Sequence, residues 1–257
     1  MSGSPDEFHI RSEAEYEDAL SRFPYPLTIV PGDQALEEYE RLKREGVGTP
    51  VIVGGASELV LTLEVYESSL PFEPSAGILL ERASELVFPE HHRWVVAQKI
   101  EALLQLQPRL RVTGRDLTVQ RIGDWPDCQI GESFEVTAAY DAGSGQPWPR
   151  VHTAVLPTQN PTEAPAYLRS GGWNDMPESA TLVSALRRWR ERHGAELISL
   201  SYDSMDIRVQ RTATSRDEAI ELAREHFLFC PDVLGDVTLH ELAAHLIEND
   251  WWFFWWD

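Results

Sequence analysis

The sequence ends in Trp251-Trp-Phe-Phe-Trp-Trp-Asp257, a run of six aromatic residues. Its length suits one strand, in which alternate side chains point to opposite faces. One face then carries Trp251, Phe253 and Trp255, and the other face carries the other three aromatics. Burial of both faces favours a central core strand, whereas burial of one face would leave three large aromatics exposed as a binding hot spot. We expect the core strand.

Two strands and three helices are predicted upstream of this run. Residues 196–202 and 205–210 alternate around Asp203-Ser204, which predicts an antiparallel hairpin. Ser215 and Thr238 each stand three residues before a glutamate, as in the capping box that starts a helix. The predicted helices span residues 180–193, 215–229 and 238–247. Together these elements predict a mixed or antiparallel sheet packed by three helices and ending in the aromatic strand.

A further hairpin and a long connection precede these elements. Residues 133–138 and 151–156 alternate on either side of a Gly/Pro-rich turn, which predicts antiparallel pairing. The stretch from about 157 to 179 is polar and shows no regular pattern. Connections of this length are uncommon in compact domains and are often functional.

The N-terminal region alternates strands and helices. Apolar runs at 27–30 and 49–53 predict buried strands, and a helix over about 34–45, with Asp33 as its N-cap and Gly46 at its end, lies between them. Another helix begins near Ser57. This β-α-β-α order favours a parallel pair of strands.

Residues 74–107 are mostly helical in pattern with an interruption at Pro89, and residues 117–122 alternate like a strand. We place a soft boundary near residue 128. This divides the chain into an N-terminal α/β region, 1–128, and a second domain, 129–257. The overall prediction is an α+β fold.

The charge of the chain indicates which classes of macromolecule it is expected to bind. The chain carries 42 acidic and 22 basic side chains, a formal charge of −20. This field repels phosphate backbones and attracts basic proteins, so a basic protein is the expected partner and nucleic acid is not. The apolar runs are too short to span a membrane, and the polar N-terminus lacks a secretory signal. We expect a cytoplasmic protein, and the sequence leaves its oligomeric state open.

Cysteine and histidine spacing does not predict a metal site. Cys128 and Cys230 are too distant in sequence to indicate a disulfide framework or a Cys-rich zinc site. His240 and His245 are five residues apart, whereas the zinc motif needs a spacing of four to place both on one helix face. His226 and Cys230 are four residues apart, but the sequence shows no further evident ligands beside them. We expect a partly exposed histidine, a buried cysteine, and neither metal nor cofactor.

Two familiar motifs are incomplete or missing. Gly54-Gly55 follows an apolar strand and precedes a helix, where phosphate-binding turns occur, but the rest of such a motif is lacking. A plain strand-to-helix turn is expected there. The sequence also contains no Gly-x-Ser-x-Gly nucleophile elbow.

Several short motifs stand out in the second half of the chain: Gly171-Gly-Trp-Asn174 with Pro177, Trp189 through Glu196, Glu218-Ala219, Phe229-Cys-Pro-Asp232 and the terminal aromatic run. With these motifs, residues 132–257 resemble a bacterial family known as domain of unknown function 4253. It implies one structural unit over about half the chain. It implies no activity and no catalytic residue, because the family has none established.

The predicted binding loop lies within the long polar connection. Glycine supplies backbone freedom, and an aromatic plate with polar neighbours suits contact with a ligand or peptide. The candidate binding residues are Gly171, Gly172, Trp173, Asn174 and Asp175. The alternative is a folded lid in which Trp173 fills the core and Asn174 caps a turn.

Three functions stay open on the sequence. The first is a non-catalytic protein-binding module, including an immunity-type protein that neutralises a basic toxin or effector. The second is an enzyme with a dispersed carboxylate site, for example Asp175, Asp203 and Asp232. The third is a regulatory domain that binds a small ligand through the Trp173 loop. Converging carboxylates in one pocket would favour the enzyme.

Overall fold

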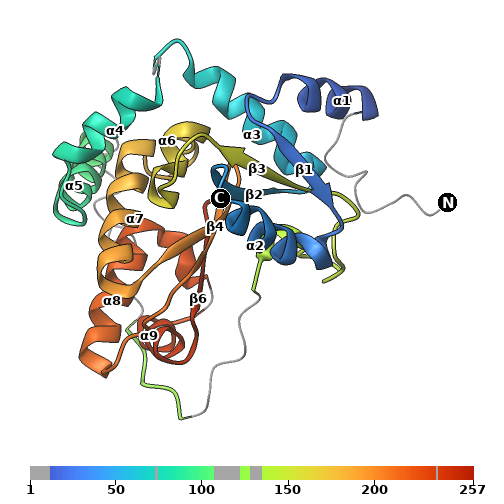
Figure 1. The fold of residues 1–257 in the computed structure, drawn as a ribbon. Helices are drawn as coiled ribbons and strands as arrows, with labels where there is room; N and C mark the ends of the chain where they lie inside the picture. The colour runs from blue at the N-terminus through green and yellow to red at the C-terminus, as the bar shows by residue number, and fades with distance from the viewer. Residues whose placement is uncertain (1–11, 73–74, 107–121, 128–134, 236) are drawn as a thin grey trace.

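The computed structural model describes residues 12–72, 75–106, 122–127, 135–235 and 237–257 as an α+β fold around one mixed sheet (Figure 1). The strands are β1 (Leu27–Val30), β2 (Thr49–Gly54), β3 (Val151–Leu156), β4 (Glu196–Leu200), β5 (Ser204–Arg208) and β6 (Trp251–Trp255). Their order across the sheet is β1-β3-β2-β4-β5-β6. The predicted α+β class and the aromatic final strand are confirmed.

Nine α-helices surround the sheet within the described residues. They are α1 (Glu13–Arg22), α2 (Ala35–Glu45), α3 (Ala56–Ser69), α4 (Ala76–Glu85), α5 (Glu90–Leu106), α6 (Ala164–Leu168), α7 (Ser179–His193), α8 (Arg216–Phe229) and α9 (Leu239–Glu248). Short 3-10 helices are η2 (Gly32–Gln34), η4 (Thr137–Ala139), η5 (Pro161–Glu163) and η6 (Pro231–Leu234). None of the helices in these ranges combines the length and apolar character needed to cross a bilayer.

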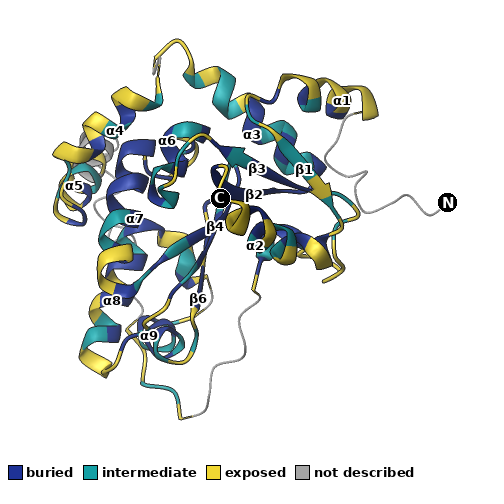
Figure 2. Ribbon diagram, viewed as in Figure 1, coloured by how far each residue is buried: buried dark blue, intermediate teal, exposed yellow. Residues whose placement is uncertain are grey.

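The two faces of the sheet are covered unequally. Val51, Val53 and Ile207 join a large apolar cluster with helices α1, α3 and α6–α9. Ile52 and Ile198 point the other way, into a smaller cluster with α2 and the residues around η4. Figure 2 shows the buried central strands and the exposed outer faces of the helices.

Local signals in the sequence define several helix ends. The Ser215 hydroxyl accepts a hydrogen bond from the Glu218 N–H at 3.2 Å. Thr238 and Glu241 form a reciprocal capping box, with distances of 3.2 and 2.7 Å. Gly194 ends α7 with φ 64°, a left-handed conformation that glycine adopts at low cost. These predicted helix boundaries are confirmed.

Strand β3 corrects two predictions. It lies between β1 and β2 and runs antiparallel to both, so β1 and β2 are not neighbours. Val151 faces the smaller cluster and Ala154 the larger one, which suits β3 to a central place in the sheet. The predicted partner at 133–138 does not pair with it, because Thr137–Ala139 form a 3-10 turn. Residues 133–134, and 117–121 of another predicted strand, lie outside the described residues.

Two smaller expectations are also wrong. Asp33 lies inside η2 and does not cap α2, whose N-cap residue Gln34 makes no side-chain capping bond. The predicted loop at 157–179 contains η5 and α6. The start of η5 is explained by Asn160, because its side chain accepts a hydrogen bond from the Thr162 N–H at 3.3 Å.

Both predicted regions of the chain contribute to the same sheet. Strands β1 and β2 come from 1–128, whereas β3 to β6 come from 129–257. The large apolar cluster also contains residues of both. The division at residue 128 stays a prediction about folding units.

Candidate functional site

The predicted binding loop is a compact turn. Gly171 has φ 101°, and a Cβ there would lie 2.0 Å from the Pro177 carbonyl oxygen. The Gly172 N–H donates to the Met176 carbonyl and the Met176 N–H to the Trp173 carbonyl, each at 3.0 Å. Gly171 is therefore required by the close approach of two chain segments.

The five predicted residues separate into two groups. Gly171, Gly172 and Trp173 line an open pocket of about 450 Å³ against the end of α3, and Trp173 is 51% exposed. Asn174 and Asp175 are not among the residues that line it. Asn174 has φ 49°, and its amide nitrogen lies 3.5 Å from the Trp256 carbonyl oxygen. The Trp173 side chain is thus left half-exposed at the pocket, whereas Asn174 shapes the turn.

Replacing Asn174 by alanine is expected to cost about 1 kcal/mol of unfolding free energy, because alanine tolerates a left-handed backbone poorly. Asn174→Gly should restore that stability. The neighbouring Asp175→Ala should change it by less than about 0.5 kcal/mol, as surface substitutions usually do. Urea denaturation measures all three variants. Equal losses for alanine at 174 and 175 would show that side-chain contacts, and not backbone conformation, hold the loop.

The last strand is an edge strand, and this corrects its predicted central position. Among the described strands β6 pairs only with β5. Trp252 and Phe254 are buried on the helical face, whereas Phe253 and Trp255 on the opposite face are 41% and 46% exposed. Trp251 is buried in the smaller apolar cluster, on the side of the sheet that α2 covers. The face that the core leaves uncovered therefore carries two large aromatics.

Phe253 and Trp255 form one side of a groove of about 470 Å³, which we call the acidic aromatic groove. Its other aromatic residues are Tyr140, Trp148 and Tyr202, and its charged residues are Glu58, Asp141 and Asp203. The Trp255 indole N–H donates to an Asp203 carboxylate oxygen at 3.2 Å. This bond holds the exposed indole beside a negative charge.

Asp206 anchors the floor of the groove. It accepts hydrogen bonds from the N–H groups of Thr137 and Ala138 at 3.2 and 3.3 Å, and from the Ser199 hydroxyl at 2.5 Å. Burial raises the pKa of Asp206, and these hydrogen bonds oppose the rise. These contacts hold Thr137 and Ala138, which line the groove, against β5.

Tyr202 supplies a polar group to the same groove. Burial, and after it the charge of Asp203, raises the pKa of Tyr202 above its ordinary value. The phenol therefore stays protonated at neutral pH and can donate a hydrogen bond. Every charged lining residue among the described residues is acidic, so the groove suits a cation.

Residues 152–257 match a protein-family model described as Domain of unknown function (DUF4253). This part of the chain is a DUF4253 domain. The match confirms the predicted resemblance and begins at residue 152, downstream of the expected 132. The search of curated proteins and the search of solved structures gave no match to the chain.

The acidic aromatic groove lies where the DUF4253 domain meets the preceding part of the chain. The domain contributes Tyr202, Asp203, Phe253 and Trp255. The segment before residue 152 contributes the other two aromatics and two of the carboxylates. Alternation along the last strand signalled the exposed aromatics, but no sequence pattern signalled the opposite wall.

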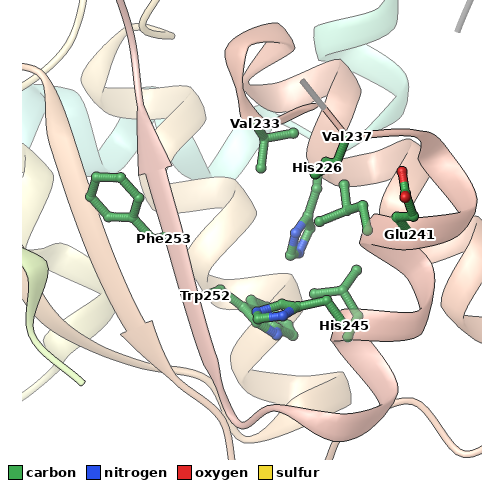
Figure 3. A pocket seen from close by; sticks show the side chains of 9 residues that line it. His226, Val233, Val237, Glu241, His245, Trp252 and Phe253 are labelled. Atoms are coloured by element: carbon green, nitrogen blue, oxygen red, sulfur yellow. The ribbon is translucent and has the colours of Figure 1, made fainter. Parts of the chain in front are cut away.

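A second cavity, of about 210 Å³, lies inside the DUF4253 domain between α8, α9 and β6 (Figure 3). His226 and His245 line it beside Trp252, and the His226 and Trp252 ring centroids are 4.6 Å apart. His226 is buried, which corrects the predicted partial exposure, because its ring packs between core aromatics. Burial lowers the pKa of His226 and His245, so both rings are neutral at pH 7.

The histidines and the cysteine that were weighed as metal ligands do not converge. His245 lines the cavity, whereas His240 packs against Trp125. Cys230 donates to the Trp255 carbonyl at 3.0 Å, and burial raises the pKa of its thiol to about 12. Such a thiol is a poor metal ligand. The described part of the chain contains no group of three or more His, Cys, Asp or Glu side chains placed to hold a metal.

The other chemical candidates are also placed by the structure. Of the three dispersed carboxylates, Asp203 lines the acidic aromatic groove, whereas Asp175 and Asp232 do not. Asp232 accepts the Asp257 N–H at 3.3 Å. At the Gly54-Gly55 turn a Cβ on Gly55 would meet the Glu58 carboxylate at 2.8 Å. That carboxylate would repel a phosphate from the turn.

Proposed function

We propose that the protein is a non-catalytic binding module that takes a basic segment of another protein into the acidic aromatic groove. One observation carries this proposal: Phe253 and Trp255 are exposed on an otherwise well-packed strand, beside charged residues that are all acidic. An immunity-type protein that neutralises a basic toxin or effector is one form of this function.

The charges of the groove favour a cationic partner. Glu58, Asp141 and Asp203 come from separate parts of the chain and line the same depression. The formal charge of −20 adds a long-range field that increases the rate of encounter with basic proteins. A lysine or arginine side chain entering the groove would lie close to these carboxylates.

The aromatic side chains provide binding energy of a second kind. Trp, Tyr and Arg dominate the hot spots of protein interfaces, and a guanidinium over an aromatic face gains about 0.5–2 kcal/mol. The backbone at Phe253 and Trp255 is already ordered by its pairing with β5, so little backbone entropy is lost on binding. Both features suit recognition of an arginine-rich segment.

A direct test uses two ten-residue peptides, one alternating arginine with alanine and the other glutamate with alanine. The arginine peptide should bind in calorimetry, the glutamate peptide should not, and added salt should weaken binding. The double variant Phe253→Thr/Trp255→Thr keeps strand-forming residues and should weaken binding about 30-fold, the effect of losing one hot spot of about 2 kcal/mol.

Trp94→Gln is the matched control, because Trp94 is 61% exposed on α5 and does not line the groove. It should bind the arginine peptide as the parent does. Equal binding of both peptides, or undiminished affinity in the double variant, would contradict the proposed function.

A further inference from the structure

Arg169 is a buried cation without a counter-ion in the described structure. It is 6% exposed and is the only buried lysine or arginine among the described residues. No carboxylate of those residues pairs with it, and its Nη1 atom has no hydrogen-bond partner there. More exposed arginines are paired: Arg188 lies 2.7 Å from Glu225, and Arg208 lies 3.1 Å from Glu196. Burial of an unpaired charge is costly, so this position calls for a partner.

The backbone at Arg169 points to the same conclusion. The residue follows α6 with φ 53° and ψ 33°, a left-handed conformation that favours glycine and is strained for arginine. Glycine would relieve that strain. An arginine at a strained position is explained if its side chain has a function.

The surroundings of Arg169 do not neutralise its charge. The guanidinium lies over the Tyr66 ring, 5.2 Å from the centroid, and Tyr25 donates its hydroxyl to the Tyr167 carbonyl at 2.8 Å. Burial is the largest cause of a raised pKa at Tyr25, so that phenol is uncharged. The adjacent Ser170 hydroxyl is also buried and without a partner in the described structure.

Arg169 lines the open pocket of about 450 Å³ described above, which we call the arginine pocket. Val65, Phe72 and Trp173 supply apolar surface, and Gly171 and Gly172 let a ligand approach the main chain. Glu178 also lines the pocket but lies beyond ion-pair distance of Arg169, because no salt bridge joins them. The pocket therefore combines the unpaired Arg169 with partly apolar walls, and Glu178 is the one acidic residue among its described lining residues.

We propose that the arginine pocket binds a small molecule that carries a carboxylate or phosphate on an apolar body. A guanidinium presents parallel N–H donors to two oxygens of either anion, and the apolar part would lie against Trp173 and Phe72. This site is independent of the acidic aromatic groove, which has the opposite charge. The protein would then hold an anionic ligand and a basic partner at separate places.

The test measures binding of phenylacetate, phenyl phosphate and uncharged phenylacetamide by calorimetry at constant ionic strength. At least one anion should bind, about tenfold or more tightly than the amide, because a charge-assisted hydrogen bond is lost in the amide. The tighter of the two anions identifies the carboxylate or the phosphate as the natural group. Equal binding of acid and amide, or no binding of either anion at millimolar concentration, overturns the proposal.

Arg169→Met should lose anion binding and melt, without ligand, at the parent temperature or above, because it removes an unpaired buried charge. Ser68→Trp should block the pocket without touching Arg169, since Ser68 is exposed on α3 and lines the pocket. Ser84→Trp is its matched control, because both serine hydroxyls donate to a carbonyl three residues earlier. Unchanged anion affinity in Ser68→Trp, or a strongly lowered melting temperature in Arg169→Met together with anion binding that persists, overturns the assignment.

Discussion

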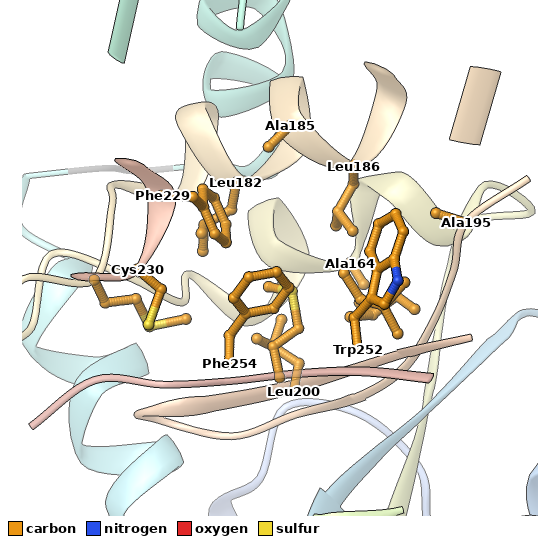
Figure 4. Close-up of a cluster of buried hydrophobic side chains, with 14 of the residues drawn as sticks. Ala164, Leu182, Ala185, Leu186, Ala195, Leu200, Phe229, Cys230, Trp252 and Phe254 are labelled. Atoms are coloured by element: carbon orange, nitrogen blue, oxygen red, sulfur yellow. The ribbon is translucent and has the colours of Figure 1, made fainter. Parts of the chain in front are cut away.

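Deleting residues 251–257 is expected to abolish cooperative unfolding. The deletion removes β6 and with it Trp252, Phe254 and Trp256, all buried in the large apolar cluster. Figure 4 shows Trp252 and Phe254 beneath the side chains of α7 and α8. Phe254 stacks on Trp189 with ring centroids 5.5 Å apart, and Trp256 meets Phe229 edge-on at 5.5 Å.

The expected loss of unfolding free energy is as large as the total stability of a typical domain. Removing one buried Phe or Trp costs about 3–5 kcal/mol, and three such residues are lost together. The total unfolding free energy of a native protein is about 5–15 kcal/mol. The truncated chain should therefore lack both a melting transition in calorimetry and near-ultraviolet circular dichroism.

The matched control is the double variant Phe253→Thr/Trp255→Thr. It removes two aromatics from the same strand but from the exposed face, so it should keep a cooperative transition. A truncated chain that melts cooperatively near the parent temperature would contradict the prediction.

The second large effect is loss of stability in mild acid. Burial lowers the pKa of His152 to about 4 and that of His92 to about 4. His152 shows why the neutral ring is required: its Nδ1 lies 3.0 Å from the Gly54 carbonyl oxygen, and its Nε2 lies 2.9 Å from the Tyr16 hydroxyl. Nδ1 must donate to the carbonyl, which leaves Nε2 to accept from Tyr16.

The sign follows from proton linkage. Unfolded histidine has a pKa of about 6.5, so between that value and about pH 4 the unfolded chain binds more protons than the folded chain. The contribution of each neutral histidine to the unfolding free energy is therefore full above about pH 6.5, and it falls as the pH decreases. Each of the two histidines should remove about 3 kcal/mol by pH 4, with a slope near 1.4 kcal/mol per pH unit.

Urea denaturation between pH 7 and pH 4.5 measures this slope. Above about pH 5.5 the carboxylates contribute little, because their ordinary pKa values are about 4, so the slope there reports mainly histidine. His152→Gln should reduce the slope by about 1.4 kcal/mol per pH unit, because glutamine does not titrate in this range. A pH-independent unfolding free energy across the window would contradict the prediction.

The helices could be predicted closely because their causes are local. Gly46 and Gly194 end helices through their own left-handed backbone, and Ser215 and Thr238 cap N–H groups three residues away. The hairpin of β4 and β5 is local in the same sense. Such contacts depend on spacing along the chain, so a short window of sequence contains the relevant information.

The order of the strands could not be predicted this way. Strand β3 enters between β1 and β2, although many residues separate it from both. Its place depends on which apolar faces remain to be covered once the helices pack. The same competition leaves β6 at the edge, a position that its own five aromatic residues do not determine.

Some features of the candidate sites were determined by the sequence, and others only by the tertiary structure. The sequence by itself determined the acidic charge, the helix ends, the glycine turn at Gly171 and the alternation that puts Phe253 and Trp255 on one face. Only the tertiary structure decided that this face stays exposed and that Arg169 is buried without a counter-ion. Burial and charge pairing depend on residues that folding brings together from distant segments. The periodicity of one segment shows which side chains share a face, but it does not show which distant residues contact that face.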